Sequence, residues 1–366
     1  MSRLPEKSSL TRSQLLDYFS DCPFLGCSPY IPIKDESKNM VVRTYFAINS
    51  KTKEEVVIKM VERGKPWNDL VANELRVHWL SYGHPYIAEL QDVFLTSGYI
   101  GIVMKFVPGL DLDKMIEQKS APLTETVARR VFQQLLLAVK FLHDSGYSNR
   151  DLKVNNIIFD EETGSIALQD FMYSRHDQVN SDPREAFKGL PYTPPELLAG
   201  GSKDDFGNSA NAWELGVCLF KMVTGKFPFE KPGDKKTTYS TVPVIIQRIA
   251  IMDYTVPDTL SESLKDLFRK IFVQNTSERI LLEEICAHPW VNEAPWPYTP
   301  DDITQAMQSR TCPVDRETVE TLIVAAKSRD PHDMMTSRDT ETLCDAVTDD
   351  ILLESSTKQR IEEMQL

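Results

Sequence analysis

The sequence lacks the features that mark nucleic-acid binding, membrane insertion and secretion. No run rich in Lys and Arg stands out, and 54 acidic residues against 41 basic ones give a formal net charge of −13. This balance argues against binding to nucleic acid or to a membrane surface and favours proteins and small molecules as partners. No run approaches the roughly 18 apolar residues of a membrane span, and no apolar segment follows the first residues. We therefore expect a protein of the cytoplasm or of the nucleus, with the cytoplasm as the first choice.

Cysteine is sparse and no internal repeat is visible. Of the six cysteines only Cys22 and Cys27 lie close together, and no second pair or histidine cluster matches them. This spacing favours plain reduced thiols over a disulfide framework or a zinc site. The 366 residues, 41% of them apolar, are enough for one large two-lobed domain or two ordinary domains with a sizeable core.

Apolar periodicity divides the chain into a strand-rich first part and a mostly helical second part. The first part also has a hairpin turn at 49–53 and one helix at 67–80. Strand-like ranges are 41–48, 55–59 and 100–104, and later helix-like ranges are 125–142, 213–223, 260–271 and 281–287. Beyond Pro297 the composition shifts, because residues 301–366 hold 15 acidic and 7 basic residues, a net charge of −8. This acidic region has helix-like patches at 314–326 and 350–364.

One polar stretch carries most of the chemical information. It reads Asn149-Arg150-Asp151-Leu152-Lys153-Val154-Asn155-Asn156, and Asp170-Phe171-Met172 begins fourteen residues after its end. Asp170 is nineteen residues past Asp151, a separation that suits a hairpin carrying both carboxylates to one place. Carboxylate and amide oxygens are the hard donors that Mg²⁺ requires.

From about Val41 to Trp290 the chain resembles the eukaryotic Ser/Thr protein kinases, in particular the plant-type sucrose-non-fermenting-related branch of the calcium/calmodulin-kinase group. The segments that carry the resemblance are Val56-Val57-Ile58-Lys59, Ile102-Val103-Met104, Asp151-Leu152-Lys153, Pro195-Glu196, Gly225-Lys226-Phe227-Pro228-Phe229, Arg279 and His288-Pro289-Trp290. The resemblance implies an α+β, bilobal protein-kinase fold. Its parts would be an N-terminal extension at 1–30, a small β-rich N-lobe at 31–105, a larger helical C-lobe at 106–293 and an acidic tail at 294–366.

The same resemblance implies ATP and Mg²⁺ as cofactors and protein Ser/Thr side chains as substrates. Asp151 would accept the proton of the substrate hydroxyl, and Lys153 would contact the transferring phosphate. Lys59, held by Glu74, would bind the α- and β-phosphates.

Further positions near the nucleotide follow from the same alignment. Asn156 and Asp170 would be the metal ligands. Met104 would lie at the back of the adenine pocket, beside Lys105 at the hinge. Asp111 is either a ribose ligand or the N-cap of a helix. Glu196 and Arg279 would form a buried ion pair that braces the helical lobe.

Several supporting positions depart from the family pattern. No glycine occurs at 37–42, where the family has its Gly-rich turn. Asn149 replaces a His that packs under Phe171, and Met172 replaces a Gly that allows unusual backbone angles. Asn211 replaces an Asp that clamps the backbone of the catalytic loop. Since a misplacement of about 1 Å can cost on the order of a hundredfold in rate, we expect a slow kinase.

Two other functions remain open from the sequence. The first is a pseudokinase that binds nucleotide or partners without catalysis, which the altered supporting residues favour. The second is a small-molecule kinase, which Pro195-Glu196 and His288-Pro289-Trp290 disfavour.

Regulation is predicted at the segment before Pro195. In this family branch, phosphorylation there supplies charge to the residue at Arg150. Here Glu185 would supply a fixed negative charge, so that activation needs no upstream kinase, or it is simply a solvated side chain. Ser181 is a candidate phosphorylation site, and the alignment puts Gly189 where the family has a bracing Thr. The acidic tail is either a docking arm for a regulatory partner or a solvated extension.

Overall fold

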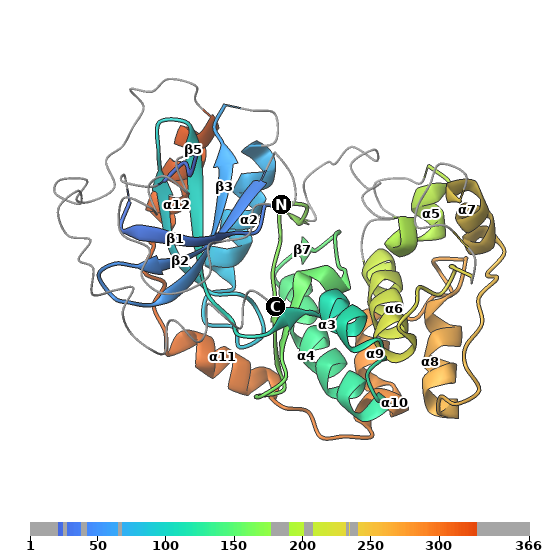
Figure 1. Cartoon of the computed structure of the whole chain (residues 1–366). Helices are drawn as coiled ribbons and strands as arrows, with labels where there is room; N and C mark the ends of the chain where they lie inside the picture. The colour runs from blue at the N-terminus through green and yellow to red at the C-terminus, as the bar shows by residue number, and fades with distance from the viewer. Residues whose placement is uncertain are drawn as a thin grey trace. The chain divides into compact units, whose positions relative to one another are not determined.

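The computed structural model describes residues 21–24, 28–37, 42–64, 68–176, 190–200, 208–231, 234 and 241–327. The chain forms two compact units (Figure 1). Unit 1 comprises the described residues up to Leu75, Leu90–Phe106 and the described residues from Cys312 onward. Unit 2 comprises Arg76–Glu89 and Val107–Thr311. Sequence analysis placed the lobes at 31–105 and 106–293; the contacts instead group 76–89 with unit 2 and the described residues from 312 with unit 1.

Unit 1 is built on a five-stranded antiparallel sheet in the order β1-β2-β3-β5-β4. Its strands are β1 (Tyr30–Asp35), β2 (Val42–Asn49), β3 (Glu55–Glu62), β4 (Leu90–Leu95) and β5 (Tyr99–Lys105). The predicted hairpin is β2–β3, and Lys53 at its turn has the left-handed φ of 63°. Tyr30, Tyr45 and Phe94 form an aromatic core with Phe24, so that one face of the sheet is buried.

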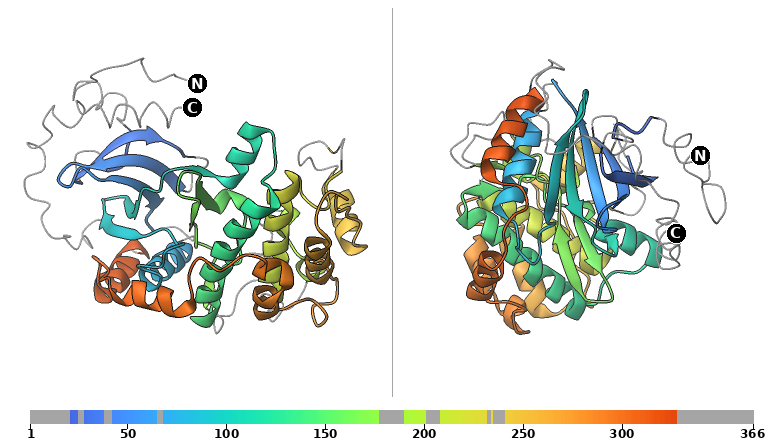
Figure 2. Two further views of the ribbon diagram at one scale, coloured as in Figure 1. Left: turned by 90° about the horizontal axis from the view of Figure 1, so that it is seen from below. Right: turned by 90° about the vertical axis from the view of Figure 1, so that its left-hand side faces the viewer.

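The helix α12 (Arg316–Lys327) packs in unit 1 and buries Val319, Leu322 and Ile323. The guanidinium of Arg63 donates to the carbonyl of Ala325 from Nε at 3.2 Å and from Nη2 at 2.8 Å. Figure 2 shows α12 beside α2 (Asn68–Leu80). Within the predicted tail, one face of α12 is therefore packed, whereas the patch predicted at 350–364 lies outside the described residues.

Unit 2 is mainly helical around a continuous apolar core. The long helix α4 (Glu125–Asp144) crosses this core, and Thr124 caps its N-terminus by accepting from Val127 N–H. The other helices are α3 (Leu112–Lys119), α5 (Pro195–Leu198), α6 (Asn208–Thr224), α7 (Val242–Ala250), α8 (Glu262–Ile271), α9 (Leu282–Ala287), α10 (Pro289–Asn292) and α11 (Pro300–Gln308). The sheet-rich first part and the helical second part confirm the predicted α+β fold.

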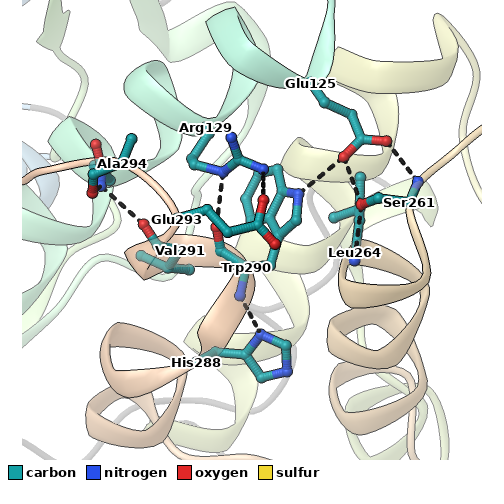
Figure 3. A network of polar contacts seen from close by, with 10 residues as sticks. Glu125, Arg129, Ser261, Leu264, His288, Trp290, Val291, Glu293 and Ala294 are labelled. Atoms are coloured by element: carbon teal, nitrogen blue, oxygen red, sulfur yellow. Dashed lines mark hydrogen bonds and ion pairs between the residues drawn. The ribbon is translucent and has the colours of Figure 1, made fainter.

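A polar network holds α4 against α8 and α10 (Figure 3). The carboxylate of Glu125 accepts from Ser261 N–H and Oγ, both at 2.7 Å, and from Trp290 Nε1 at 3.0 Å. Arg129 Nε donates to the Trp290 carbonyl at 2.7 Å. Gln133, which is fully buried on the same helix, donates to the carbonyls of Val291 and Ala294. These bonds fix the helical frame of unit 2.

No helix within the part of the chain that the structure describes is long and apolar enough to cross a membrane.

Candidate functional site

Two short strand pairings position the polar stretch within unit 2. Strand β7 (Tyr147–Ser148) pairs with β10 (Arg175–His176), so the loop beginning at Asn149 lies next to the segment that follows Phe171. Strands β8 (Ile157–Asp160) and β9 (Ser165–Leu168) form an antiparallel hairpin. This is the hairpin expected between Asp151 and Asp170. At its open end, Gln169 N–H donates to the Asn156 carbonyl at 2.9 Å.

Asp151, Lys153 and Asn156 form one hydrogen-bonded cluster. Lys153 Nζ lies 2.6 Å from Asp151 Oδ2, and Asp151 is buried, with 8% of its surface exposed. Asn156 Nδ2 donates to the Asp151 carbonyl at 3.0 Å and lies 3.4 Å from Oδ2. The predicted base, the predicted phosphate contact and one predicted metal ligand are thus brought together.

The donor set fits a magnesium ion bound by Asn156 and Asp170. Since Nδ2 of Asn156 is committed to Asp151, the amide oxygen Oδ1 is the atom left for a ligand, and within the described residues it makes no hydrogen bond. Asp170 has a left-handed φ of 71°, a conformation that costs energy for a residue other than glycine and is common at functional sites. An amide oxygen and a carboxylate are suitable ligands for Mg²⁺.

The backbone at Met172 does not need the conformational freedom of the glycine that the family has at this position. Among the described residues, the non-glycine residues with positive φ include Arg150 and Asp170 but not Met172. Met172 therefore sits in a backbone conformation that any residue adopts, and its side chain is buried. The unusual backbone angles of this turn fall on Asp170 instead, so a glycine at 172 is not required for them.

Phe171 packs against His78 rather than against a His in the catalytic loop. The two rings meet edge to face, with centroids 5.0 Å apart, and His78 Nδ1 lies 2.9 Å from the Ala88 carbonyl. Asn149 accepts from Asp151 N–H through Oδ1 at 3.1 Å, while its buried Nδ2 finds no partner among the described residues. Sequence analysis missed His78; its place one helical turn after Glu74 was the available signal.

Unit 1 carries the predicted phosphate-binding pair. Lys59 Nζ lies 2.6 Å from Glu74 Oε1, and the Glu74 side chain is fully buried. Lys59 is on β3, and Glu74 is at the middle of α2. Met104 is buried near the end of β5, and Lys105 is the exposed last residue of that strand. The ends of the predicted Gly-rich turn are described at Ser37 and Val42, whereas residues 38–41 lie outside the described part.

Asp111 acts as a helix cap. Its Oδ1 accepts from Lys114 N–H at 2.9 Å at the N-terminus of α3, and it is 5% exposed. The cap that was one of the two predicted roles is therefore formed, and the ribose contact stays a prediction.

The predicted regulatory residues are only partly within the described structure. Arg150 has a left-handed φ of 63° in the catalytic loop. Glu185, Ser181 and Gly189 lie outside the described residues, so their roles stay predictions.

The ion pair between Arg279 and Glu196 is present and bidentate. Nη1 and Nη2 of Arg279 donate to the two carboxylate oxygens at 2.7 and 2.8 Å. Arg279 also lies over the ring of Trp213, 5.0 Å from its centre. These contacts tie α5 to α6 and to the segment before α9, as expected for a structural brace.

A second group of possible metal ligands lies away from this loop. His143, Asp144 and Glu283 each offer a ligand atom, and these atoms lie within 4.8 Å of one another. However, Lys140 Nζ already contacts both oxygens of Asp144, at 2.9 and 3.0 Å. Because the ammonium neutralises this exposed carboxylate, we assign no metal to the group.

Comparison with known proteins agrees with this geometry. The sequence pattern of the protein kinase domain matches residues 41–291. Similar proteins include the serine/threonine-protein kinases SRK2G and SRK2H of Arabidopsis thaliana, with 36% identity over 242 residues and 35% over 245 residues. Serine/threonine-protein kinase SAPK4 of Oryza sativa subsp. japonica is 36% identical over 245 residues.

The aligned regions cover 65% of this chain for SRK2G and 66% for the other two, and 66% of each relative, just under two thirds of their length. The predicted similarity to plant Ser/Thr kinases is confirmed. The chain belongs to the protein kinase family.

Proposed function

We propose that the chain is a Ser/Thr protein kinase that transfers the γ-phosphate of ATP to protein hydroxyl groups at a reduced rate. The observation that carries this proposal is the hydrogen-bonded cluster of Asp151, Lys153 and Asn156, in which the groups assigned to the reaction hold one another in place. The names of the plant relatives, which are serine/threonine-protein kinases, support the same activity.

In this proposal Asp151 accepts the proton of the substrate hydroxyl as the oxygen attacks the γ-phosphorus, while the bond from that phosphorus to the bridging oxygen breaks and ADP leaves. Lys153, whose ammonium lies 2.6 Å from Asp151 Oδ2, places a positive charge where the γ-phosphate meets the hydroxyl. Such a fixed charge stabilises the negative oxygens that develop in the transition state. Mg²⁺, when held by Asn156 and Asp170, would neutralise phosphate charge.

Lys59 is the residue that we assign to the α- and β-phosphates of ATP. Its ammonium is buried with the fully buried carboxylate of Glu74, so it is fixed in direction before nucleotide arrives. A fixed ammonium loses less conformational entropy on binding than a mobile surface lysine does.

A reduced rate is proposed because several supports are weaker than in the family pattern. Residues 37–42 contain no glycine, so the backbone approaches phosphate less closely. Asn149 and Asn211 each bury an Nδ2 that has no partner among the described residues. These buried polar groups also favour the second candidate function, a pseudokinase that binds nucleotide without transferring phosphate.

The test combines transfer with nucleotide binding. Radiolabelled γ-phosphate transfer to a basic peptide is measured with amino-acid analysis of the product, next to the thermal shift given by ATP with and without Mg²⁺. We expect the product to contain phosphoserine or phosphothreonine. In the wild type the thermal shift given by ATP should require Mg²⁺, whereas in Asp170→Asn the addition of Mg²⁺ should no longer change the effect of ATP. Binding without transfer would favour the pseudokinase.

We also propose that the acidic region beyond residue 301 docks a regulatory partner. Support comes from the sequence, because residues 301–366 carry a net charge of −8 and a second helix-like patch at 350–364. Truncation after Pro300 that left both activity and thermal stability unaltered would argue against this role.

A further inference from the structure

The segment that follows α2 holds the chain just before Asp170. Leu168, the last residue of β9, lies two residues before Asp170 and pairs with Ile87 in a short parallel bridge. Its N–H donates to the Tyr86 carbonyl at 2.8 Å, and its carbonyl accepts from Ala88 N–H at 2.9 Å. The backbone leading into the proposed magnesium ligand is therefore fixed on this segment.

The residue after Asp170 is held by the same part of the chain. Phe171 packs edge to face on His78, whose Nδ1 lies 2.9 Å from the Ala88 carbonyl. Asp170 itself has a left-handed φ of 71°, and such a conformation persists where the surrounding structure fixes it. The position of Asp170 therefore depends on the position of residues 78–88.

Helix α11 and its flanking residues pack on this segment (Figure 1). Gly83 has a φ of 84°, and a Cβ built on it would lie 3.2 Å from Met307 Cα, so the two backbones approach closely. Tyr298, just before α11, meets the ring of Tyr86 edge to face, with centroids 5.9 Å apart. Since the protein kinase domain matches residues 41–291, these contacts come from beyond that domain.

Arg310 makes the polar contacts between the end of α11 and the segment. Its guanidinium donates to both carboxylate oxygens of Glu89, with Nη2 2.9 Å from Oε1. The same guanidinium lies over the ring of Tyr82, 5.5 Å from its centre. The Arg310 side chain is 43% exposed but that of Glu89 only 12%, and a bidentate geometry strengthens such a pair. One side chain thus holds the segment near both of its ends.

We propose that Arg310 is a positioning residue that, from beyond the kinase domain, keeps Asp170 in the place where it binds Mg²⁺. The contacts form one path, because Arg310 holds residues 81–89, these hold β9 at Leu168, and β9 leads into Asp170. The assignment rests on the proposed function, in which Asp170 is a magnesium ligand. Its effect on the turn is nevertheless measurable without phosphate transfer.

Substitutions at Arg310 and Glu89 separate positioning from general stabilisation. Arg310→Met removes the guanidinium and keeps an unbranched side chain, whereas Arg310→Lys keeps the charge without the two parallel hydrogen bonds. Glu89→Gln is made alone and together with Arg310→Met. The matched control is Arg248→Met, because Arg248 on α7 also donates to both oxygens of one carboxylate, that of Asp234.

Two quantities are measured in each variant. One is hydrogen exchange of the peptide covering residues 165–173, and the other is the Mg²⁺ concentration that gives half of the ATP-induced thermal shift. We expect Arg310→Met to raise both about fivefold, the scale of one partly exposed ion pair with a cation–π contact. Arg310→Lys should give a smaller change, and Glu89→Gln should add little to Arg310→Met, because the two residues act as a pair. Arg248→Met should change neither quantity.

The proposal is overturned if Arg310→Met lowers thermal stability while either quantity stays at its wild-type value, since Arg310 would then be only a structural brace. It is also overturned if the effects of Arg310→Met and Glu89→Gln add in full, or if Arg248→Met changes both quantities as much. If the wild type transfers no phosphate but binds ATP with Mg²⁺, the proposed activity fails and the two quantities still decide the role of Arg310. A wild type whose ATP binding needs no Mg²⁺ would contradict both proposals.

Discussion

Breaking the buried ion pair of Arg279 and Glu196 should destabilise unit 2 strongly. The perturbation is Arg279→Leu, which removes the guanidinium but keeps an apolar side chain in the core. Arg279 and Glu196 have side chains that are 0% and 8% exposed, and two short hydrogen bonds join them. Arg279 also donates to the carbonyls of Ser209 and Val273.

The size of the destabilisation is set by the polar groups that lose their partner when the guanidinium is removed. Glu196 would keep a buried charge without its counter-ion, and such losses cost about 3–5 kcal/mol. The unpaired Val273 and Ser209 carbonyls act in the same direction. For a domain of this size, about 4 kcal/mol corresponds to a fall in Tm of roughly 10 °C. A second change, Glu196→Leu, removes the stranded charge and should recover part of the loss.

The assay is urea denaturation followed by circular dichroism, with Arg269→Leu as a matched control. Arg269 is 59% exposed and pairs with the exposed Glu262 at 3.3 Å, so its removal should have no measurable effect. The reasoning from burial would be refuted if Arg279→Leu were no more destabilised than Arg269→Leu. It would also be refuted if adding Glu196→Leu to Arg279→Leu lowered the free energy of unfolding by about the same amount again.

Three further predictions concern pH, the C-terminal helix and regulation. Burial lowers the pKa of His84 to about 4, and its Nδ1 accepts from Tyr86 N–H, so the folded protein holds it neutral. The unfolded state takes the proton first as pH falls, so roughly 3 kcal/mol of stability should be lost between pH 6.5 and 4. Relative to wild type, His84→Gln should flatten the unfolding free energy over that range; equal slopes would contradict the assignment. Arg63→Met, which removes the bonds to Ala325, should lower stability by about 2 kcal/mol and speed hydrogen exchange over 316–327; unchanged exchange there would count against docking of α12. Glu185→Ala should reduce activity and increase protease cleavage within 177–189, and the fixed-charge hypothesis is dropped if neither changes.

Periodicity predicted the elements that are long or uniformly apolar. The helix predicted at 125–142 is α4 (Glu125–Asp144), and the strand predicted at 55–59 is the first part of β3 (Glu55–Glu62). Strand β4 (Leu90–Leu95) was not predicted because Gln91 and Asp92 interrupt its apolar pattern. Its pairing with β5 stabilises the strand, and that contact cannot be seen in the local sequence. Likewise, the packing of α12 in unit 1 depends on Arg63, which is distant in sequence, and composition alone made this region look like a separate tail.

At the candidate site, motif spacing predicted which of the residues assigned to the reaction contact one another, but it did not predict the residues that support them. The distances in sequence between Lys59 and Glu74, and between Asp151 and Asn156, correspond to contacts in the structure. The sequence analysis interpreted Asn149, Met172 and Asn211 as losses of supporting contacts, because it considered each position alone. The structure instead puts His78 against Phe171, a contact that no motif describes.

The most direct test of the account is phosphate transfer by the wild type and by Asp151→Asn under saturating Mg²⁺ and ATP. The substitution removes the proposed base while keeping the size of the side chain that Lys153 and Asn156 contact. We predict slow but measurable transfer by the wild type and a fall of roughly 10² to 10⁴ in the variant, with the ATP-induced thermal shift retained. Transfer at the same rate in both proteins, or binding of ATP with no transfer by the wild type, would contradict the claim that the reacting groups are intact.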